Sequence, residues 1–194
     1  MGGASARMGR DKATIQLGGR TLQERCVAAL SDAGCTTIWL VGARVLDPDL
    51  CAGSDRPADG DGPQLVPWPD SEPGAGPFAA LAGLISCGPP RDLMVLPCDL
   101  PLIDSAAVSS FLAAAEAASG DVVLARIDGR QQLTSGLWRA GVALPPLPWA
   151  DISMRRGLEG ITVSYVDVDG RFADVDTPEE LQASQERFFG PPAR

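Results

Sequence analysis

Residues 93–101 read LMVLPCDLP, in which the apolar run 93–96 is followed at once by Pro97 and shortly afterwards by Asp99. A short, continuous apolar run of this kind predicts a strand that is buried on both faces. Open α/β sheets bind ligands beyond the carboxyl ends of their strands, which is where Asp99 would lie. A carboxylate there can hold a cation that bridges phosphate oxygens, but an aspartate that only turns the chain before Pro101 would give the same sequence. These residues alone favour neither interpretation.

Helix and strand patterns alternate on both sides of this run. The spacing of apolar residues, the capping-box pair Thr21 and Glu24, and Pro77 near a helix start predict where the helices lie. We expect helices at 22–33, 77–85, 104–119, 152–158 and 178–188, and strands at 37–41, 65–68, 93–96, 122–127, 132–138 and 161–166. Such alternation predicts an α/β fold of three layers, α/β/α, around a mainly parallel sheet.

Composition excludes several classes of protein. The 194 residues, 45% of them apolar, fit one domain with a full-sized core. The chain contains no histidine, which removes Ser/His/Asp and Cys/His catalysis and most zinc sites, so that any metal must be held by carboxylates and other oxygens, as Mg²⁺ is. The five cysteines are odd in number and form no C-x-x-C pair, which argues against a disulfide framework.

Charge and hydropathy indicate where the chain acts and on what. The net charge of −9 argues against non-specific nucleic-acid binding, which depends on cations that neutralise phosphates. No apolar stretch approaches the roughly 20 residues that cross a bilayer, and the start has no signal-peptide pattern. We therefore expect a soluble cytoplasmic protein that binds neither membranes nor nucleic acid.

The first twelve residues, MGGASARMGRDK, combine glycines with three cationic side chains. Glycine lets backbone N–H groups converge on an anion, and the side chains of Arg7 and Lys12 can neutralise its charge. This composition favours a phosphate-binding loop, although an ordinary glycine-rich tail remains an alternative.

A second acidic segment, residues 173–181, reads ADVDTPEEL. Thr177 as N-cap, Pro178 at the first helical position and Glu180 as capping-box partner explain the second half of this string as helix initiation. They leave unexplained the two carboxylates of Asp174 and Asp176, which stand at alternate positions just before the helix.

Together these segments resemble the molybdenum cofactor guanylyltransferases and related nucleotidyltransferases. The pattern S-x-R-M-G-x-D-K over 5–12 matches the signature of that family, and C-D-x-P over 98–101 matches its second motif. Residues 69–77, PDSEPGAGP, are similar to the family's D-x-x-P-G-x-G-P-L-A-G segment, but Phe78 and Ala80 depart from it. The segment 174–179 has D-x-D-T-P-E, as in cytidylyl-transferring relatives, where the guanylyltransferases often have N-x-N-T-P-E.

The resemblance implies a Rossmann-like sheet of the nucleotidyltransferase type, in one domain over 1–189 with a frayed tail at 190–194. It implies a Mg²⁺-dependent enzyme that transfers GMP from GTP to the phosphate of molybdopterin and releases pyrophosphate. Transient contact with other proteins of cofactor biosynthesis would accompany that role. A cytidylyltransferase, a transferase for another small phosphorylated acceptor and a non-catalytic nucleotide-binding relative stay open as alternatives.

The resemblance also assigns roles to individual residues. Its catalytic residues would be Arg7, Lys12 and Asp99, and Asp99 would bind the metal together with Asp176, with Asp174 in reserve. Contacts to the nucleotide would come from Gly2, Gly3, Arg7, Lys12, Asp70 and Asp99. Because the family's loop follows a central strand, we expect the start to lack a first strand. An upstream extension of about 5 to 6 residues should then raise stability and nucleotide affinity.

Overall fold

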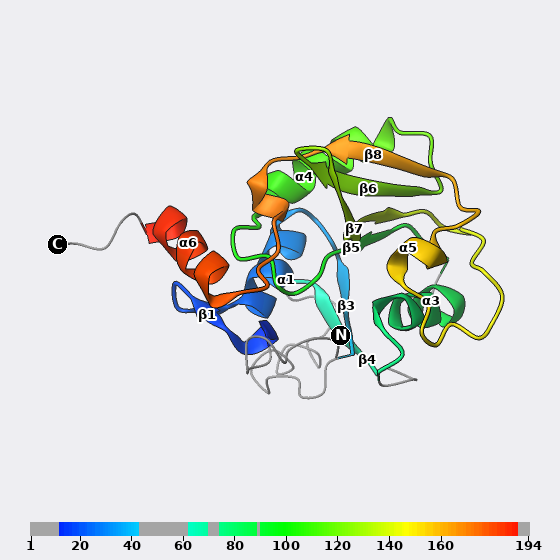
Figure 1. Ribbon diagram of the computed structural model, residues 1–194, viewed down its shortest axis with the longest axis horizontal. Coiled ribbons are helices and arrows are strands. Elements are labelled where there is room, and N and C mark those ends of the chain that lie inside the picture. The colour runs from blue at the N-terminus through cyan, green and yellow to red at the C-terminus, as the bar shows by residue number, and fades with distance from the viewer. Residues whose placement is uncertain (1–11, 43–61, 70–73, 89, 190–194) are drawn as a thin grey trace.

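The computed structural model describes residues 12–42, 62–69, 74–88 and 90–189 (Figure 1). The helices are α1 (Leu22–Asp32), α3 (Pro77–Cys87), α4 (Ser105–Glu116), α5 (Met154–Gly157) and α6 (Pro178–Phe189), with 3-10 turns η1 (Lys12–Thr14) and η2 (Gly170–Phe172). The strands are β1 (Gln16–Leu17), β2 (Arg20–Thr21), β3 (Thr37–Val41), β4 (Gln64–Trp68), β5 (Leu93–Val95), β6 (Val122–Ile127), β7 (Arg130–Trp138) and β8 (Val163–Asp167).

The largest sheet has four strands in the order β5-β7-β6-β8. Strands β6 and β8 are parallel, while β7 runs antiparallel to both β5 and β6. The reversal follows from a two-residue turn, in which Asp128 and Gly129 adopt φ values of 47° and 80°, as a tight hairpin of this type requires. Strands β3 and β4 form a separate parallel pair.

Strand β6 shows why the fold has three layers. Because side chains alternate along a strand, its neighbouring residues enter two different cores. Val123 and Ala125 pack in a core with residues of α1 and α4. Val122 and Leu124 pack in a second core with residues of α3 and α5. The sheet is therefore covered by helices on both faces, and the predicted α/β/α architecture with parallel elements is confirmed.

The predicted helices and strands are all present, with small shifts at their ends. The α1 capping box is confirmed, since the Glu24 N–H donates to Thr21 Oγ1 at 3.1 Å and the Thr21 N–H donates to a Glu24 carboxylate oxygen at 2.5 Å. The sequence analysis missed the β1–β2 hairpin, whose two strands have two residues each. In the described part of the chain, none of the helices has the length and hydropathy of a membrane span.

Candidate active site

Three carboxylates meet beyond the end of β5. Asp99 follows this strand, and Asp174 and Asp176 lie between η2 and α6. One oxygen of each carboxylate lies within 4.8 Å of the others. The predicted convergence of the two acidic segments is thus present in the structure.

A backbone hydrogen bond joins these two segments. The N–H of Val175 donates to the carbonyl oxygen of Asp99 at 3.1 Å. The Val175 side chain is 2% exposed and packs in a small core with Leu17 and Leu22. In an extended chain, alternate side chains share a face, so burying Val175 directs Asp174 and Asp176 together to the opposite side.

The peptide groups around Asp176 are held by the start of α6. The N–H groups of Asp176 and Thr177 donate to Glu180 Oε2 at 2.7 and 3.0 Å. In return, the Glu180 N–H donates to Thr177 Oγ1 at 3.2 Å. This is the capping box that the sequence predicted, and it fixes the backbone of Asp176 without engaging its carboxylate.

Lys12, the only lysine in the chain, bridges two of the three carboxylates. Its Nζ donates to Asp176 Oδ1 at 2.6 Å and to Asp99 Oδ2 at 3.0 Å. Burial alone would lower the pKa of Lys12, but the hydrogen bonds to Asp176 and Asp99 outweigh it and raise that pKa above its ordinary value. The ammonium group therefore stays charged and offsets part of the negative charge of the cluster.

The second oxygen of Asp99 is buried and has no hydrogen-bond partner among the residues that the structure describes. An unpaired buried acceptor costs about 1–3 kcal/mol, so this atom favours a ligand that supplies positive charge. The surroundings of Asp174 also disfavour a negative charge. Desolvation by the surrounding atoms and then the charge of Asp99 raise the pKa of its carboxyl group. An all-oxygen set of three carboxylates fits Mg²⁺ or Mn²⁺.

The structure brings together Lys12, Asp99 and Asp176 from the predicted site, and it adds the reserve residue Asp174 to the same group. The remaining predicted contacts, Gly2, Gly3, Arg7 and Asp70, lie outside the described residues and stay predictions.

Two features of the site were not predicted. One is the ion pairing of Lys12 with the carboxylates, since the sequence analysis placed this lysine on phosphate. The other is the anchoring role of Val175. An apolar residue between two aspartates at alternate positions was the signal that could have revealed it.

The sequence is similar to a described family and to named relatives. A family model described as the MobA-like NTP transferase domain matches residues 1–165. The molybdenum cofactor guanylyltransferase of Xanthomonas euvesicatoria pv. vesicatoria is 32% identical over 113 residues, which cover 58% of this chain and 50% of that protein. A probable molybdenum cofactor guanylyltransferase of Synechococcus elongatus is 27% identical over 195 residues, covering 95% of this chain and 94% of that protein.

The fold is also similar to a solved structure. The crystal structure of molybdopterin-guanine dinucleotide biosynthesis protein A from Archaeoglobus fulgidus superposes with a TM-score of 0.64 at 18% identity, covering 96% of this chain and 95% of that one. This likeness concerns the fold, and it confirms the predicted nucleotidyltransferase type of sheet.

Proposed function

Because the chain belongs to the MobA-like NTP transferase family, we propose that it transfers GMP from GTP to the phosphate of molybdopterin and releases pyrophosphate. At the coarser level it is a nucleotidyltransferase related to the molybdenum cofactor guanylyltransferases. The proposal includes Mg²⁺ as the metal, the cytoplasm as the compartment and transient contact with other proteins of cofactor biosynthesis. It includes no binding to nucleic acid or membranes.

The observation that carries this proposal is the carboxylate group around Asp99, with its unpaired buried oxygen. Asp99 and Asp176 would hold Mg²⁺, and Asp174 completes the same group. A bound Mg²⁺ would neutralise charge on the phosphates of the nucleotide. Nucleotidyl transfer depends mainly on positioning and on such charge neutralisation.

The proposed reaction needs no general base from the protein. The acceptor phosphate attacks the α-phosphorus of GTP, a new P–O bond forms, and the bond to the β-phosphate oxygen breaks to release pyrophosphate. A phosphate monoester has its second pKa near 6, so it is a nucleophile at neutral pH without a general base. This agrees with a chain that contains no histidine.

Lys12 has two roles in the proposal. Without nucleotide, its ammonium group pairs with Asp99 and Asp176 and keeps the like charges together. If Asp99 and Asp176 held a divalent cation, the ammonium group of Lys12 would be available to the nucleotide phosphates. Arg7 and the amides of Gly2 and Gly3 would bind the same phosphates, and Asp70 would contact the nucleotide.

The test is a screen of GTP, CTP, ATP and UTP, each with Mg²⁺ and with molybdopterin or another phosphorylated acceptor, in which pyrophosphate release is measured. We expect release with GTP and molybdopterin, and its loss in Asp99→Asn. Release only with CTP would favour the cytidylyl alternative, which the pair Asp174 and Asp176 keeps open. Nucleotide binding without release under any combination would identify a non-catalytic relative.

A further inference from the structure

Most side chains of helix α6 are exposed, and two of its apolar side chains contact the rest of the protein. Leu181 packs on the small core that contains Val175. Phe188, seven positions later and therefore on the same face of the helix, lies against Arg25 of α1. Figure 1 shows α6 at one end of the molecule, beside the β1–β2 hairpin. The helix is thus held near its start by Leu181 and near its end by Phe188.

The contact of Phe188 is with a charge. The guanidinium carbon of Arg25 lies 4.4 Å from the centroid of the Phe188 ring, which is well within the distance of a cation–π interaction. Such an interaction favours a ring face over the cation, so it selects one placement of the end of α6 although Phe188 remains 46% exposed.

Arg25 is itself held in place by the backbone of β1. Its Nε donates to the carbonyl oxygen of Leu17 at 3.1 Å, and its Nη2 donates to the same oxygen. Leu17 is 1% exposed and belongs to the same small core as Val175. Desolvation, and then the charge of Arg20, lower the pKa of Arg25, but a guanidinium group stays charged in proteins. A partly desolvated cation gains more from an aromatic face than an exposed one does.

The same core and the same helix set the place of two carboxylates. Val175 lies in the core between Asp174 and Asp176, and its N–H donates to the carbonyl oxygen of Asp99. Glu180, in the first turn of α6, accepts the N–H of Asp176 at 2.7 Å. A change in how α6 lies against α1 would therefore move the backbone that carries these carboxylates.

We propose that Arg25 and Phe188 are positioning residues for the carboxylate group: their contact holds α6 against α1 and so sets where Asp174 and Asp176 lie relative to Asp99. Neither residue belongs to the group itself. The consequence for metal binding rests on the proposed function, whereas the consequence for the order of residues 173–181 does not.

The first test is hydrogen exchange without metal or nucleotide, in wild type and Phe188→Ala. A cation–π pair changes a local opening equilibrium about two- to fivefold, and we expect exchange in peptides over 173–181 to speed up by that factor. Peptides over 122–138, from β6 and β7, serve as the internal reference and should not change. The matched control is Gln185→Ala, at an exposed position of the same helix.

The second test is Mg²⁺ binding, measured by calorimetry on the same variants without nucleotide. When the contact is lost, part of the binding energy goes into ordering the segment, so we expect the affinity of Phe188→Ala to fall about two- to fivefold. The Mg²⁺ concentration for half-maximal pyrophosphate release should rise by the same factor, with turnover at saturating Mg²⁺ unchanged. A residue that only stabilised the fold would not separate these two quantities.

Conservative variants separate the ring face from bulk. Phe188→Tyr keeps an aromatic face and should behave as wild type, whereas Phe188→Leu keeps an apolar side chain and should behave as Phe188→Ala. In Arg25→Met, which removes the cation, Phe188→Ala should add no further effect, because the two residues act through one contact.

The proposal is overturned if exchange over 173–181 is equal in Phe188→Ala and Gln185→Ala, or if Phe188→Leu matches the wild type. Faster exchange with unchanged Mg²⁺ affinity would overturn the positioning role as well. A wild type that releases no pyrophosphate would instead refute the proposed reaction, and the exchange and calorimetry comparisons would still decide on Arg25 and Phe188.

Discussion

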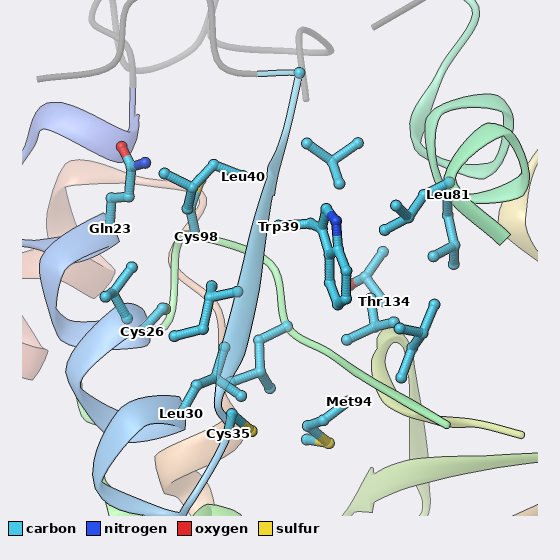
Figure 2. Close-up of a pocket in the computed structure, with 18 of the residues that line it drawn as sticks. Gln23, Cys26, Leu30, Cys35, Trp39, Leu40, Leu81, Met94, Cys98 and Thr134 are labelled. Carbon is cyan, nitrogen blue, oxygen red and sulfur yellow. The ribbon is translucent and has the colours of Figure 1, made fainter. Parts of the chain in front are cut away.

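Two regions meet on β5 and are built in different ways. At its carboxyl end, charged side chains from three segments converge, and backbone hydrogen bonds and a capping box fix each segment. Along one edge of β5 lies a mainly apolar cavity, here called the slot, which residues of β3, β5, α1 and α3 line (Figure 2). On this side β5 has no neighbouring strand in the described chain. The charged site depends on a few polar interactions, whereas the slot depends on how the apolar side chains of the surrounding helices and strands pack. Substitutions at the first should therefore change activity more than stability, and substitutions at the second should do the reverse.

The largest effect is expected for Asp99→Asn. The substitution keeps the size of the side chain but removes the charge that pairs with Lys12 and would hold the metal. Loss of one preorganised electrostatic contact costs about 10²–10³-fold in turnover, and we expect at least that loss in pyrophosphate release. The melting temperature should change little. Asp128→Asn is the matched control, because Asp128 lies in the β6–β7 turn, and asparagine tolerates its positive φ.

Lys12→Met separates the contribution of the lysine cation from that of the carboxylates that would hold the metal. Methionine keeps much of the side chain's length and removes the cation, so the carboxylates no longer have an internal competitor for Mg²⁺. We expect turnover to fall on the order of 10- to 100-fold, while the Mg²⁺ affinity measured by calorimetry rises. Lys12→Arg should restore part of the turnover. Weaker Mg²⁺ binding in Lys12→Met would contradict the proposed exchange of lysine for metal.

Because Lys12 is the only lysine, amine acylation gives a direct readout of the same exchange. In the wild type, Mg²⁺ should speed acylation at this one side chain by releasing it from Asp99 and Asp176. Labelling of the N-terminal amine provides the internal reference. An unchanged ratio of the two rates would show that the ion pair persists when Mg²⁺ is present.

The sequence was sufficient for features that short segments determine. The capping residues Thr21 and Thr177 marked helix starts, and Asp99 could be placed at the end of a strand because LMVL precedes it. The ion pair of Lys12 could not be predicted, since it spans 87 positions to Asp99 and 164 to Asp176. The residues that line the slot could not be predicted for the same reason, because they depend on which strands pair across the sheet.

Two leucines test the packing of the slot against that of a closed core. Leu124 is fully buried between helices, whereas Leu84, 5% exposed, borders the cavity. Leucine-to-alanine substitutions in cores cost about 2–5 kcal/mol, depending on how tightly the surrounding atoms pack against the side chain. We expect Leu124→Ala to lie near the top of this range and Leu84→Ala near the bottom, as measured by urea unfolding. Equal costs would indicate that the slot is as closely packed as the core around Leu124.

The smallest effect at neutral pH is expected at Cys26, where the two regions touch. Its side chain lines the slot, and its thiol donates to the carbonyl oxygen of Pro97 at 3.3 Å, two residues before Asp99. Burial, and to a lesser extent the charge of Cys98, raise the pKa of the Cys26 thiol from 9.0 to about 12. Above the lower value the unfolded chain loses this proton, while the folded chain keeps it until the higher value.

The free energy of unfolding should therefore fall as pH rises from 9.0 toward about 12, by up to about 1.4 kcal/mol per pH unit for one proton. Below this window the thiol contributes no pH dependence, because it is protonated in both states. Urea unfolding across the window should show a smaller slope in Cys26→Ala than in the wild type. Cys87→Ala, at an exposed cysteine, should leave the slope unchanged. An equal slope in Cys26→Ala would mean that the thiol is hydrated through the slot, and that this side of the slot is open to water.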